Sequence, residues 1–253
     1  MAPSVKKAKG GITKPNWLEL PIDLTKNILE RLDTVQIVTS ARNVCPLWWN
    51  ICKDPLMWRT IRIDNIHYTL FGYGCLEKIC RLAVDLSCGQ VEDINIDVIG
   101  TDALFKYIAH RETHLRRLRL CFCGQISSKR LSEFVKFSLL EEIEILYCKN
   151  MSKDNLELIG RCCPLLKSLN FGRMLDCAFV NEPFAIAKTM TRLSHLELFG
   201  VSIDDVGLFA ILDGCPLLHS LDLEGCCCEY LSPSLEKRCH GKIRDFRPPK
   251  YRG

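Results

Sequence analysis

One hydrophobic pattern recurs six times between residues 91 and 223. Each copy has two apolar residues separated by two positions, and a third apolar residue two positions further on. The copies are "VEDINI" from Val91, "LRRLRL" from Leu115, "LEEIEI" from Leu140, "LKSLNF" from Leu166, "LSHLEL" from Leu193 and "LHSLDL" from Leu218. Their starts are 24, 25, 26, 27 and 25 residues apart, which predicts a chain built from stacked repeats.

Within each repeat, the pattern predicts a strand, a turn and a helix. The alternating apolar residues favour the strand, and apolar residues at helical spacing follow it, as at Leu156 and Ile159. Ser152 stands where a helix should begin, and Ser202 with Asp205 three residues later is typical of a capping box. Because one unit cannot cover its own apolar edge, the units should stack into a curved solenoid with a parallel sheet on its concave face.

The repeats resemble the leucine-rich repeat, and in detail its cysteine-containing class. The segments "LRRLRLCFCGQIS", "LEEIEILYCKNMS" and "LHSLDLEGC" have cysteine at the ninth position, and "CPLLKSL" and "CPLLHSL" match the helix-to-strand junction of that class. The other three repeats depart from it, with Ile99, Met174 and Val201 at the ninth position. "WRTIRI" from Trp58 fits the strand pattern as an elongated first repeat with "YTLFGYG" as an insertion.

Residues 15–57 interrupt the period and are expected to form a separate compact unit. In "NWLELPIDLTKNILERL", Leu24, Ile28 and Leu32 recur every four residues with Leu29 beside them, which predicts a helix with one apolar stripe. The unit holds more large apolar side chains than so small a body can bury. Such a surplus indicates an interface with another protein, or a helical cap that seals the end of the solenoid.

This unit resembles the F-box through three motifs in order: "LPIDLTKNILERL", "NVCPLWW" and "DPLMW". The resemblance departs at Thr25, where leucine is more usual, and at Pro46 in the third helix. It implies docking on a Skp-family linker and, through the linker, on a cullin. The positions that match the docking residues of the family are Leu20, Pro21, Ile28, Leu29, Leu32, Val44 and Trp48.

The complete layout resembles a plant-type F-box/leucine-rich-repeat protein of the α/β class. We expect a flexible basic segment at residues 1–14, a three-helix F-box at 15–57, a leucine-rich-repeat solenoid at 58–228, and a C-terminal cap with a basic tail at 229–253.

Side chains between the buried strand positions should point out of the concave face. We expect the substrate-binding residues there to be Arg117, Arg119, Glu142, Glu144, Leu146, His195, Glu197 and Phe199. An alternative is a solvated ladder in which the two arginines pair with the two glutamates of the next strand, since adjacent strands lie about 4.8 Å apart. Leu146 and Phe199 are apolar where a purely solvated face would be polar.

Charge is concentrated at the chain ends. Residues 1–14 carry +4 and residues 237–253 carry +6, which leaves −6 for the rest of a chain whose net charge is +4. The basic ends could touch nucleic acid or act as nuclear signals, but we favour solvated ends and expect no nucleic-acid partner. No run of about 18 apolar residues and no secretory signal is visible, so we expect no membrane and a cytoplasmic or nuclear location.

The 16 cysteines mostly occupy positions that suit a small apolar residue, and we expect reduced thiols. Cys226, Cys228, Cys239 and His240 offer four zinc ligands, but their spacing is irregular, and we favour a capping segment without metal. No catalytic motif is present, and no cofactor is expected.

Two functions remain. The resemblance implies a noncatalytic substrate receptor of an SCF-type cullin E3 ubiquitin ligase, whose F-box binds the linker while the repeats hold an unidentified protein substrate. The alternative is a noncatalytic repeat scaffold that acts outside a ubiquitin ligase.

Overall fold

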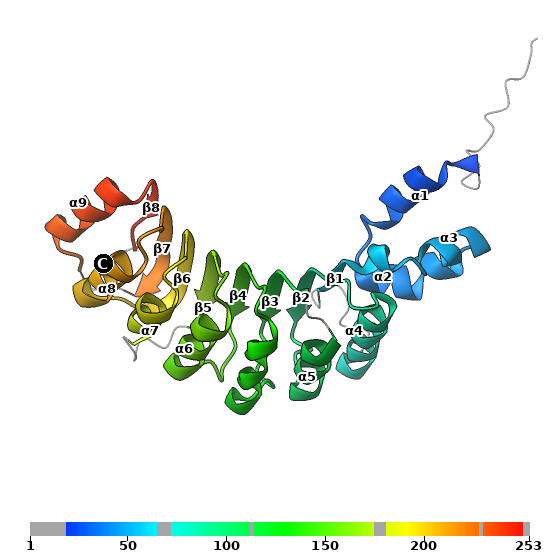
Figure 1. Cartoon of the computed structure of the whole chain (residues 1–253), viewed down its shortest axis with the longest axis horizontal. Coiled ribbons are helices and arrows are strands. Elements are labelled where there is room, and N and C mark those ends of the chain that lie inside the picture. The colour runs from blue at the N-terminus through cyan, green and yellow to red at the C-terminus, as the bar shows by residue number, and fades with distance from the viewer. Residues whose placement is uncertain (1–18, 65–71, 112–113, 175–180, 228–229, 250–253) are drawn as a thin grey trace, which may run out of the picture.

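The sheet of the protein is parallel and follows the chain order. The computed structural model describes residues 19–64, 72–111, 114–174, 181–227 and 230–249. Eight strands within these ranges pair each with the next, in the order β1 to β8 (Figure 1). They are β1 (Thr60–Ile63), β2 (Asp93–Asp97), β3 (Arg117–Cys121), β4 (Glu142–Leu146), β5 (Ser168–Gly172), β6 (His195–Ser202), β7 (Ser220–Cys227) and β8 (Asp245–Arg247). The α/β solenoid expected from the repeat period is confirmed.

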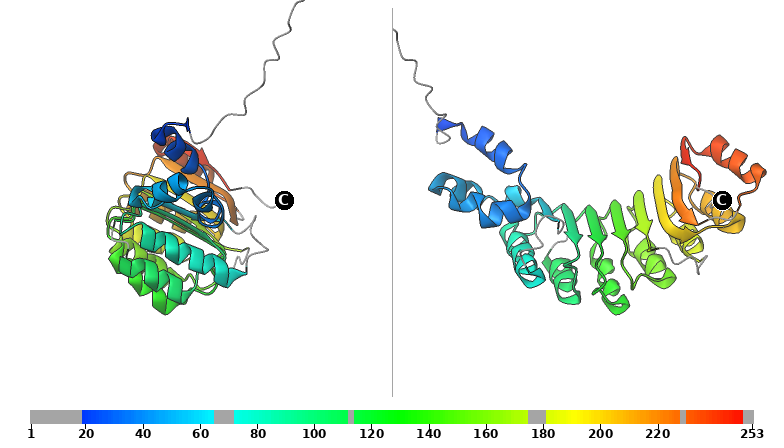
Figure 2. Two further views of the ribbon diagram at one scale, coloured as in Figure 1. Left: turned by 90° about the vertical axis from the view of Figure 1, so that its right-hand side faces the viewer. Right: turned by 180° about the vertical axis from the view of Figure 1, so that it is seen from behind.

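Helices form the convex side of the curve, and the strands line the concave side (Figures 1 and 2). The helices of the repeats are α4 (Tyr73–Leu86), α5 (Asp102–Arg111), the 3₁₀ helix η5 (Ser128–Lys136), α6 (Lys153–Cys162), α7 (Glu182–Thr189), α8 (Asp205–Gly214) and α9 (Pro233–Lys242). The predicted insertion before α4 lies mostly outside the described residues. None of the described helices has both the length and the apolar character needed to cross a bilayer.

The core is a continuous apolar layer between the strands and the helices. Leu118 and Leu120 of β3 point into it, and the equivalent residues of neighbouring repeats stack on them. Cysteines complete the layer: the Cys123 thiol donates to the carbonyl of Ile96 in the preceding repeat, at 3.6 Å. Burial raises the pKa of the Cys80 thiol to about 12, so this cysteine is protonated at neutral pH and packs as a small apolar residue.

The N-terminal unit consists of α1 (Ile22–Leu29), α2 (Thr34–Thr39), η2 (Ala41–Asn43), α3 (Pro46–Ile51) and η3 (Pro55–Trp58). Pro46 begins α3, where its missing N–H costs no hydrogen bond. Trp58 is buried, and its indole N–H donates to the carbonyl of Cys52 at 2.9 Å. The Thr34 hydroxyl accepts from the backbone N–H of Arg62 at 2.8 Å, which joins the unit to the first strand.

The C-terminal segment is more regular than the expected cap and tail. Helix α9 and strand β8 add a further repeat, with Asp245 paired to Ser220 of β7. Ile243 and Phe246 lie 25 residues after Leu218 and Leu221, so the period was present in the sequence. Only two apolar positions mark it, because Pro248 stands where the third should be.

The start of α8 also differs from the prediction. Ser202 belongs to β6, and Asp204 caps the helix by accepting from the backbone N–H of Gly207 at 2.7 Å. The predicted capping box of Ser202 and Asp205 was therefore wrong. Ser152, in contrast, caps α6 as expected, in a capping box with Asn155.

Candidate functional sites: the N-terminal apolar surface and the concave face

Helix α1 extends from the N-terminal end of the solenoid, away from the repeats (Figures 1 and 2). Its inner side holds Thr25 and Leu29, both buried, and the Thr25 hydroxyl donates to the carbonyl of Pro21 at 3.2 Å. Lys26 forms an ion pair with Asp54 at 2.7 Å, and this hydrogen bond lowers the pKa of the Asp54 carboxyl. The pair holds the middle of α1 close to the start of η3.

The N-terminal unit exposes large apolar side chains to solvent. Six large side chains there are between 37% and 62% exposed. So many exposed apolar side chains on so small a unit indicate contact with another protein. We call this set the N-terminal apolar surface: Ile22, Leu24, Ile28, Val44, Trp49 and Leu56.

The predicted linker-binding residues fall into three groups in the structure. Pro21, Ile28 and Val44 are exposed. Leu29 is 0% exposed, so in this conformation it anchors α1 from within and is not accessible to a partner. The half-buried positions are Leu20, Leu32 and Trp48.

Several exposed apolar residues were not among the predicted positions. Trp49 is 37% exposed, and the guanidinium of Arg42 lies 4.3 Å from the centre of its ring. Leu56 was also missed, although it lies in the "DPLMW" motif. The apolar periodicity indicates a helix stripe but does not show which of two adjacent tryptophans faces outward.

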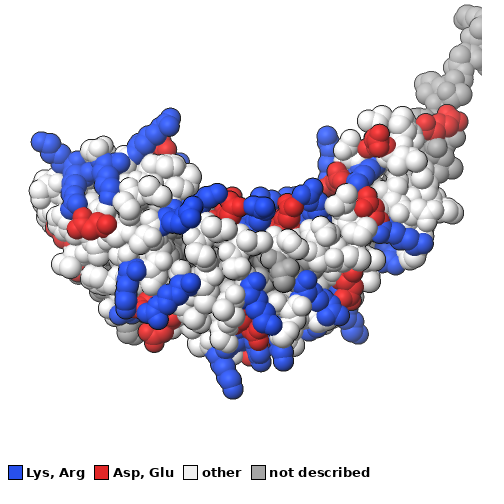
Figure 3. All heavy atoms as spheres, in the orientation of Figure 1, with Lys and Arg blue, Asp and Glu red and all other residues white. Residues whose placement is uncertain are grey.

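On the concave face, the ladder of ion pairs that was considered as an alternative is only half present. Arg119 pairs with Glu144 on the next strand at 3.2 Å, as predicted. Arg117 does not pair with Glu142 and instead contacts Asp93 on the preceding strand at 3.2 Å. Figure 3 shows the resulting line of alternating basic and acidic side chains along the concave edge. Exposed pairs of this kind contribute about 0.2–1 kcal/mol each.

The centre of the concave face is acidic. The outward positions of β4 to β7 that are paired across the sheet hold four carboxylates and no lysine or arginine. Two of them form ion pairs with arginines of the flanking strands: Glu144 pairs with Arg119 of β3, and Asp222 pairs with Arg247 of β8 at 3.0 Å. The other two, Glu142 and Glu197, have no ion pair among the described residues.

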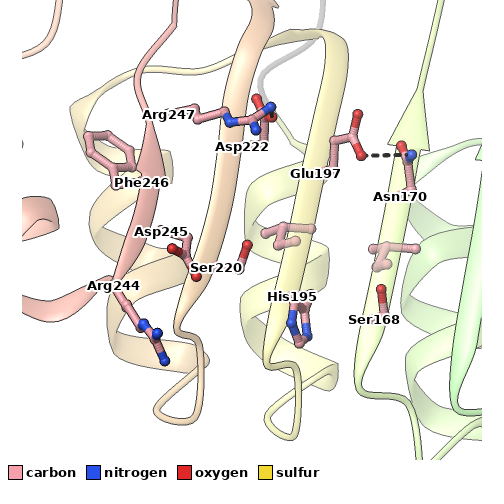
Figure 4. Close-up of a pocket in the computed structure, with 12 residues that line it drawn as sticks. Ser168, Asn170, His195, Glu197, Ser220, Asp222, Arg244, Asp245, Phe246 and Arg247 are labelled. Atoms are coloured by element: carbon pink, nitrogen blue, oxygen red, sulfur yellow. Dashed lines mark hydrogen bonds and ion pairs between the residues drawn. The ribbon is translucent and has the colours of Figure 1, made fainter.

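Glu197 lines an open hollow of about 740 Å³ at the C-terminal half of the concave face (Figure 4). Its carboxylate points toward β5 and accepts from the Asn170 amide at 2.9 Å. Burial, and then the neighbouring Asp222 and Glu144, raise the pKa of Glu197. His195 also lines the hollow (Figure 4). Its ring meets that of His219 edge-on, with the ring centroids 4.5 Å apart.

An aromatic chain lies beyond the acidic centre, at the ends of the strands. The Phe122 and Tyr147 rings stack with centroids 4.7 Å apart, and Tyr147 meets Phe199 edge-on at 5.8 Å. Phe122 is 49% and Phe199 37% exposed, and Leu146 is half-buried. We call Phe122, Tyr147 and Phe199 the aromatic ledge.

The alternation of strand positions predicted that Phe199 faces outward, but it did not predict the positions of the other two members of the ledge. Phe122 and Tyr147 directly follow their strands, where the alternation of inward and outward positions ends. Their backbones are left-handed, with φ of 53° and 56°. Bulky residues rarely adopt this conformation, so a strand pattern does not predict where these rings lie.

The described residues do not assemble the candidate zinc site. Cys226 and Cys239 are buried, His240 is exposed and packs against Phe246 at 5.2 Å, and Cys228 lies outside the described residues. Among the residues that the structure describes, no three His, Cys, Asp or Glu side chains converge on a point that could hold a metal ion.

Comparisons with known proteins agree with this layout. An F-box domain matches residues 17–60. The chain is 44% identical to F-box/LRR-repeat protein 23 of Arabidopsis thaliana over 92% of its own length and 53% of that protein, so it spans about half of this relative. It is 42% identical to the F-box protein SKIP19 and 43% identical to F-box/LRR-repeat protein 22 of the same plant. These matches cover 92% and 95% of this chain, and 77% and 79% of the relatives.

Similar solved structures are far more distant in sequence. A Bacteroides fragilis protein aligns with a TM-score of 0.49 at 11% identity, over 89% of this chain and 71% of that one. The plant relatives establish the family. They are similar to this chain over more than 90% of its length, and the chain covers more than three quarters of two of them. The chain therefore belongs to the F-box/leucine-rich-repeat family.

Proposed function

We propose that this protein is the substrate-recognition subunit of an SCF-type cullin E3 ubiquitin ligase. In this proposal, the N-terminal apolar surface binds a Skp-family linker, and the linker connects the chain to a cullin. The concave face remains free to hold a protein substrate. The observation that carries the proposal is an F-box whose large apolar side chains stay exposed at one end of a solenoid with an open concave face.

The role that we propose is noncatalytic. Ubiquitin transfer would be accelerated because the assembly holds the substrate close to the charged ubiquitin carrier, which requires binding and orientation from this chain rather than bond chemistry. Linker contact is assigned to Leu20, Pro21, Ile28, Leu32, Val44 and Trp48, with Leu29 supporting the helix from inside. We place the complex in the cytoplasm or nucleus.

The test is reconstitution of the complex from purified components. The chain, a Skp-family linker and a cullin should elute together in size-exclusion chromatography, and cullin should be lost when the linker is omitted. With the remaining ligase components added, ubiquitin should be transferred to a protein held by the repeats. A chain that binds the linker but never recruits cullin would instead be a scaffold acting outside a ubiquitin ligase.

A further inference from the structure

The aromatic ledge is an exposed apolar feature built from separate repeats. Phe122 and Tyr147 directly follow β3 and β4, Phe199 lies within β6, and the three rings form one continuous chain of contacts. Two of the three are at least 37% exposed. A large aromatic side chain gains most by leaving water, so three of them in one exposed row favour contact with an apolar side chain of a partner.

Glycines on adjacent strands make room for this arrangement. A Cβ atom on Gly225 of β7 would lie 2.0 Å from the Phe199 ring, so the ring rests directly over this glycine. An irregular register between β6 and β7 places Gly225, and not Glu224, opposite Phe199. On the other side, Leu146 leans over Gly172, whose Cβ would lie 2.8 Å from a Leu146 methyl group. On the β7 side, the Phe199 ring therefore rests on the bare backbone of Gly225. On the β5 side, Phe199 pairs with Gly172, which the Leu146 side chain covers.

The charge beside the ledge indicates which partner it fits. Glu197 lies two residues before Phe199 on the same face of β6, and Glu144 lies two residues before Leu146 on β4. The outward positions of β4 to β7 that pair across the sheet hold no lysine or arginine, and Arg247 of β8, which lines the same hollow, pairs with Asp222 and offsets only part of the negative charge around Glu197. The Asn170 amide is the hydrogen-bond donor that Glu197 has, and the Asn170 side-chain oxygen is itself buried without a partner among the described residues.

We propose that the aromatic ledge and Glu197 bind an extended segment of the substrate in which a lysine or arginine is close to a large apolar side chain. The apolar side chain packs on Phe199 and Tyr147, and the cation takes the place next to Glu197. Glu144 and Asp222 are already paired with Arg119 and Arg247, so Glu197 is the carboxylate of this group that is left to pair with a cation of the substrate. This inference rests on the proposed function, since it names the substrate class of the concave face.

The probe is a phage-displayed library of random dodecapeptides, selected against the full chain bound to its linker. The proposal predicts that enriched peptides combine lysine or arginine with a large apolar residue within a few positions. Binding of an enriched peptide should weaken about tenfold or more for Phe199→Ser and for Glu197→Gln, and it should fall as salt is added. Circular dichroism shows whether either variant has lost its fold.

The matched controls lie away from the concave face. Phe209→Ser removes an equally exposed phenylalanine of α8, at 38% against 37%, and Glu236→Gln removes a carboxylate of α9. Neither substitution should weaken binding of the enriched peptide. Enrichment of acidic peptides, which could bind near Arg244 and the two histidines, would overturn the proposal. So would an absence of enrichment, or equal binding by Glu197→Gln.

The same preparation separates the two proposals. Linker binding is measured on it independently of the peptides. A chain that holds its linker but selects no basic-apolar peptide refutes only this inference. A chain that selects such peptides but binds no linker refutes the ubiquitin-ligase role instead.

Discussion

Glu197 carries an electrostatic cost that depends on pH. Burial and neighbouring carboxylates raise its pKa, so the folded protein binds a proton at this site more tightly than the unfolded chain does. The folded state therefore loses stability as the pH rises above about 4.3, the ordinary pKa of glutamate. Glu197→Gln removes the ionisable group and still accepts from Asn170. The variant should be more stable than wild type at neutral pH, with a gain that shrinks toward acid pH.

Urea denaturation between acid and neutral pH measures the difference in unfolding free energy between Glu197→Gln and wild type. Glu236→Gln on α9 is the control for the removal of a carboxylate elsewhere in the chain, and its unfolding is measured at the same pH values. If the gain from Glu197→Gln were the same at every pH, the assignment of the cost to an ionised Glu197 would be wrong.

Gly200 is required where β6 passes close to the preceding repeat. Its backbone is left-handed, with φ of 65°, and a Cβ atom would lie 2.2 Å from the carbonyl oxygen of Arg173. Gly200→Ala should lower the free energy of unfolding by about 1–2 kcal/mol from the backbone alone, and further from the collision. Gly124→Ala is the matched control, because nothing lies within 4 Å of its added Cβ. Chemical denaturation should separate them clearly; equal stabilities would mean that the close approach is not real.

At the scale of elements, substitutions at the start of α8 test whether Asp204 caps the helix, as in the structure, or Ser202, as the sequence pattern predicted. Asp204→Ala should cost about 0.5–2 kcal/mol of unfolding free energy, because the N–H of Gly207 loses its acceptor. Ser202→Ala should cost less, since Ser202 lies within β6 and does not cap the helix. Asp204→Asn should restore most of the loss. A larger effect at Ser202 than at Asp204 in thermal denaturation would reinstate the capping box predicted from sequence.

Strand β8 should behave as part of the solenoid rather than as a tail. Ile243, which precedes it, is 3% exposed, and Ile243→Asp would bury a charge without a partner. We expect a loss of at least about 2 kcal/mol and faster hydrogen exchange at the amides of β7. The neighbouring Arg244 is exposed, so Arg244→Asp should neither lower the stability nor speed exchange in β7. Unchanged exchange in Ile243→Asp would show that β8 does not protect the sheet.

The strands were predictable because each repeat buries the same three apolar positions. Three features escaped this pattern. The irregular register between β6 and β7 depends on how two particular strands meet, and β8 retains only Ile243 and Phe246 of its apolar triplet. The 3₁₀ form of η5 was also not foreseen, since its apolar spacing fits an ordinary helix.

For the whole molecule, resemblance and geometry contributed different parts of the candidate sites. The F-box motifs indicated the docking residues, but only the structure shows that Leu29 is inside and Trp49 partly outside. Alternation along the strands placed the concave residues correctly. It did not show that Arg117 turns to Asp93, nor that Phe122 and Tyr147 extend the apolar surface beyond Phe199.

The F-box unit should bind a Skp-family linker through Leu20, Pro21 and Ile28, together with the rest of the N-terminal apolar surface. Calorimetric titration of the full chain with the linker tests it most directly, comparing wild type with the triple variant Leu20→Ala, Pro21→Ala, Ile28→Ala. The control variant carries Val135→Ala, Val206→Ala and Leu217→Ala, which truncate apolar residues of the repeats that are 59–63% exposed. We expect tight binding by wild type and by the control, and a loss of about a hundredfold or more in the first variant. Absence of binding by folded wild-type chain, or equal weakening in both variants, would show that these residues do not form a linker-binding surface.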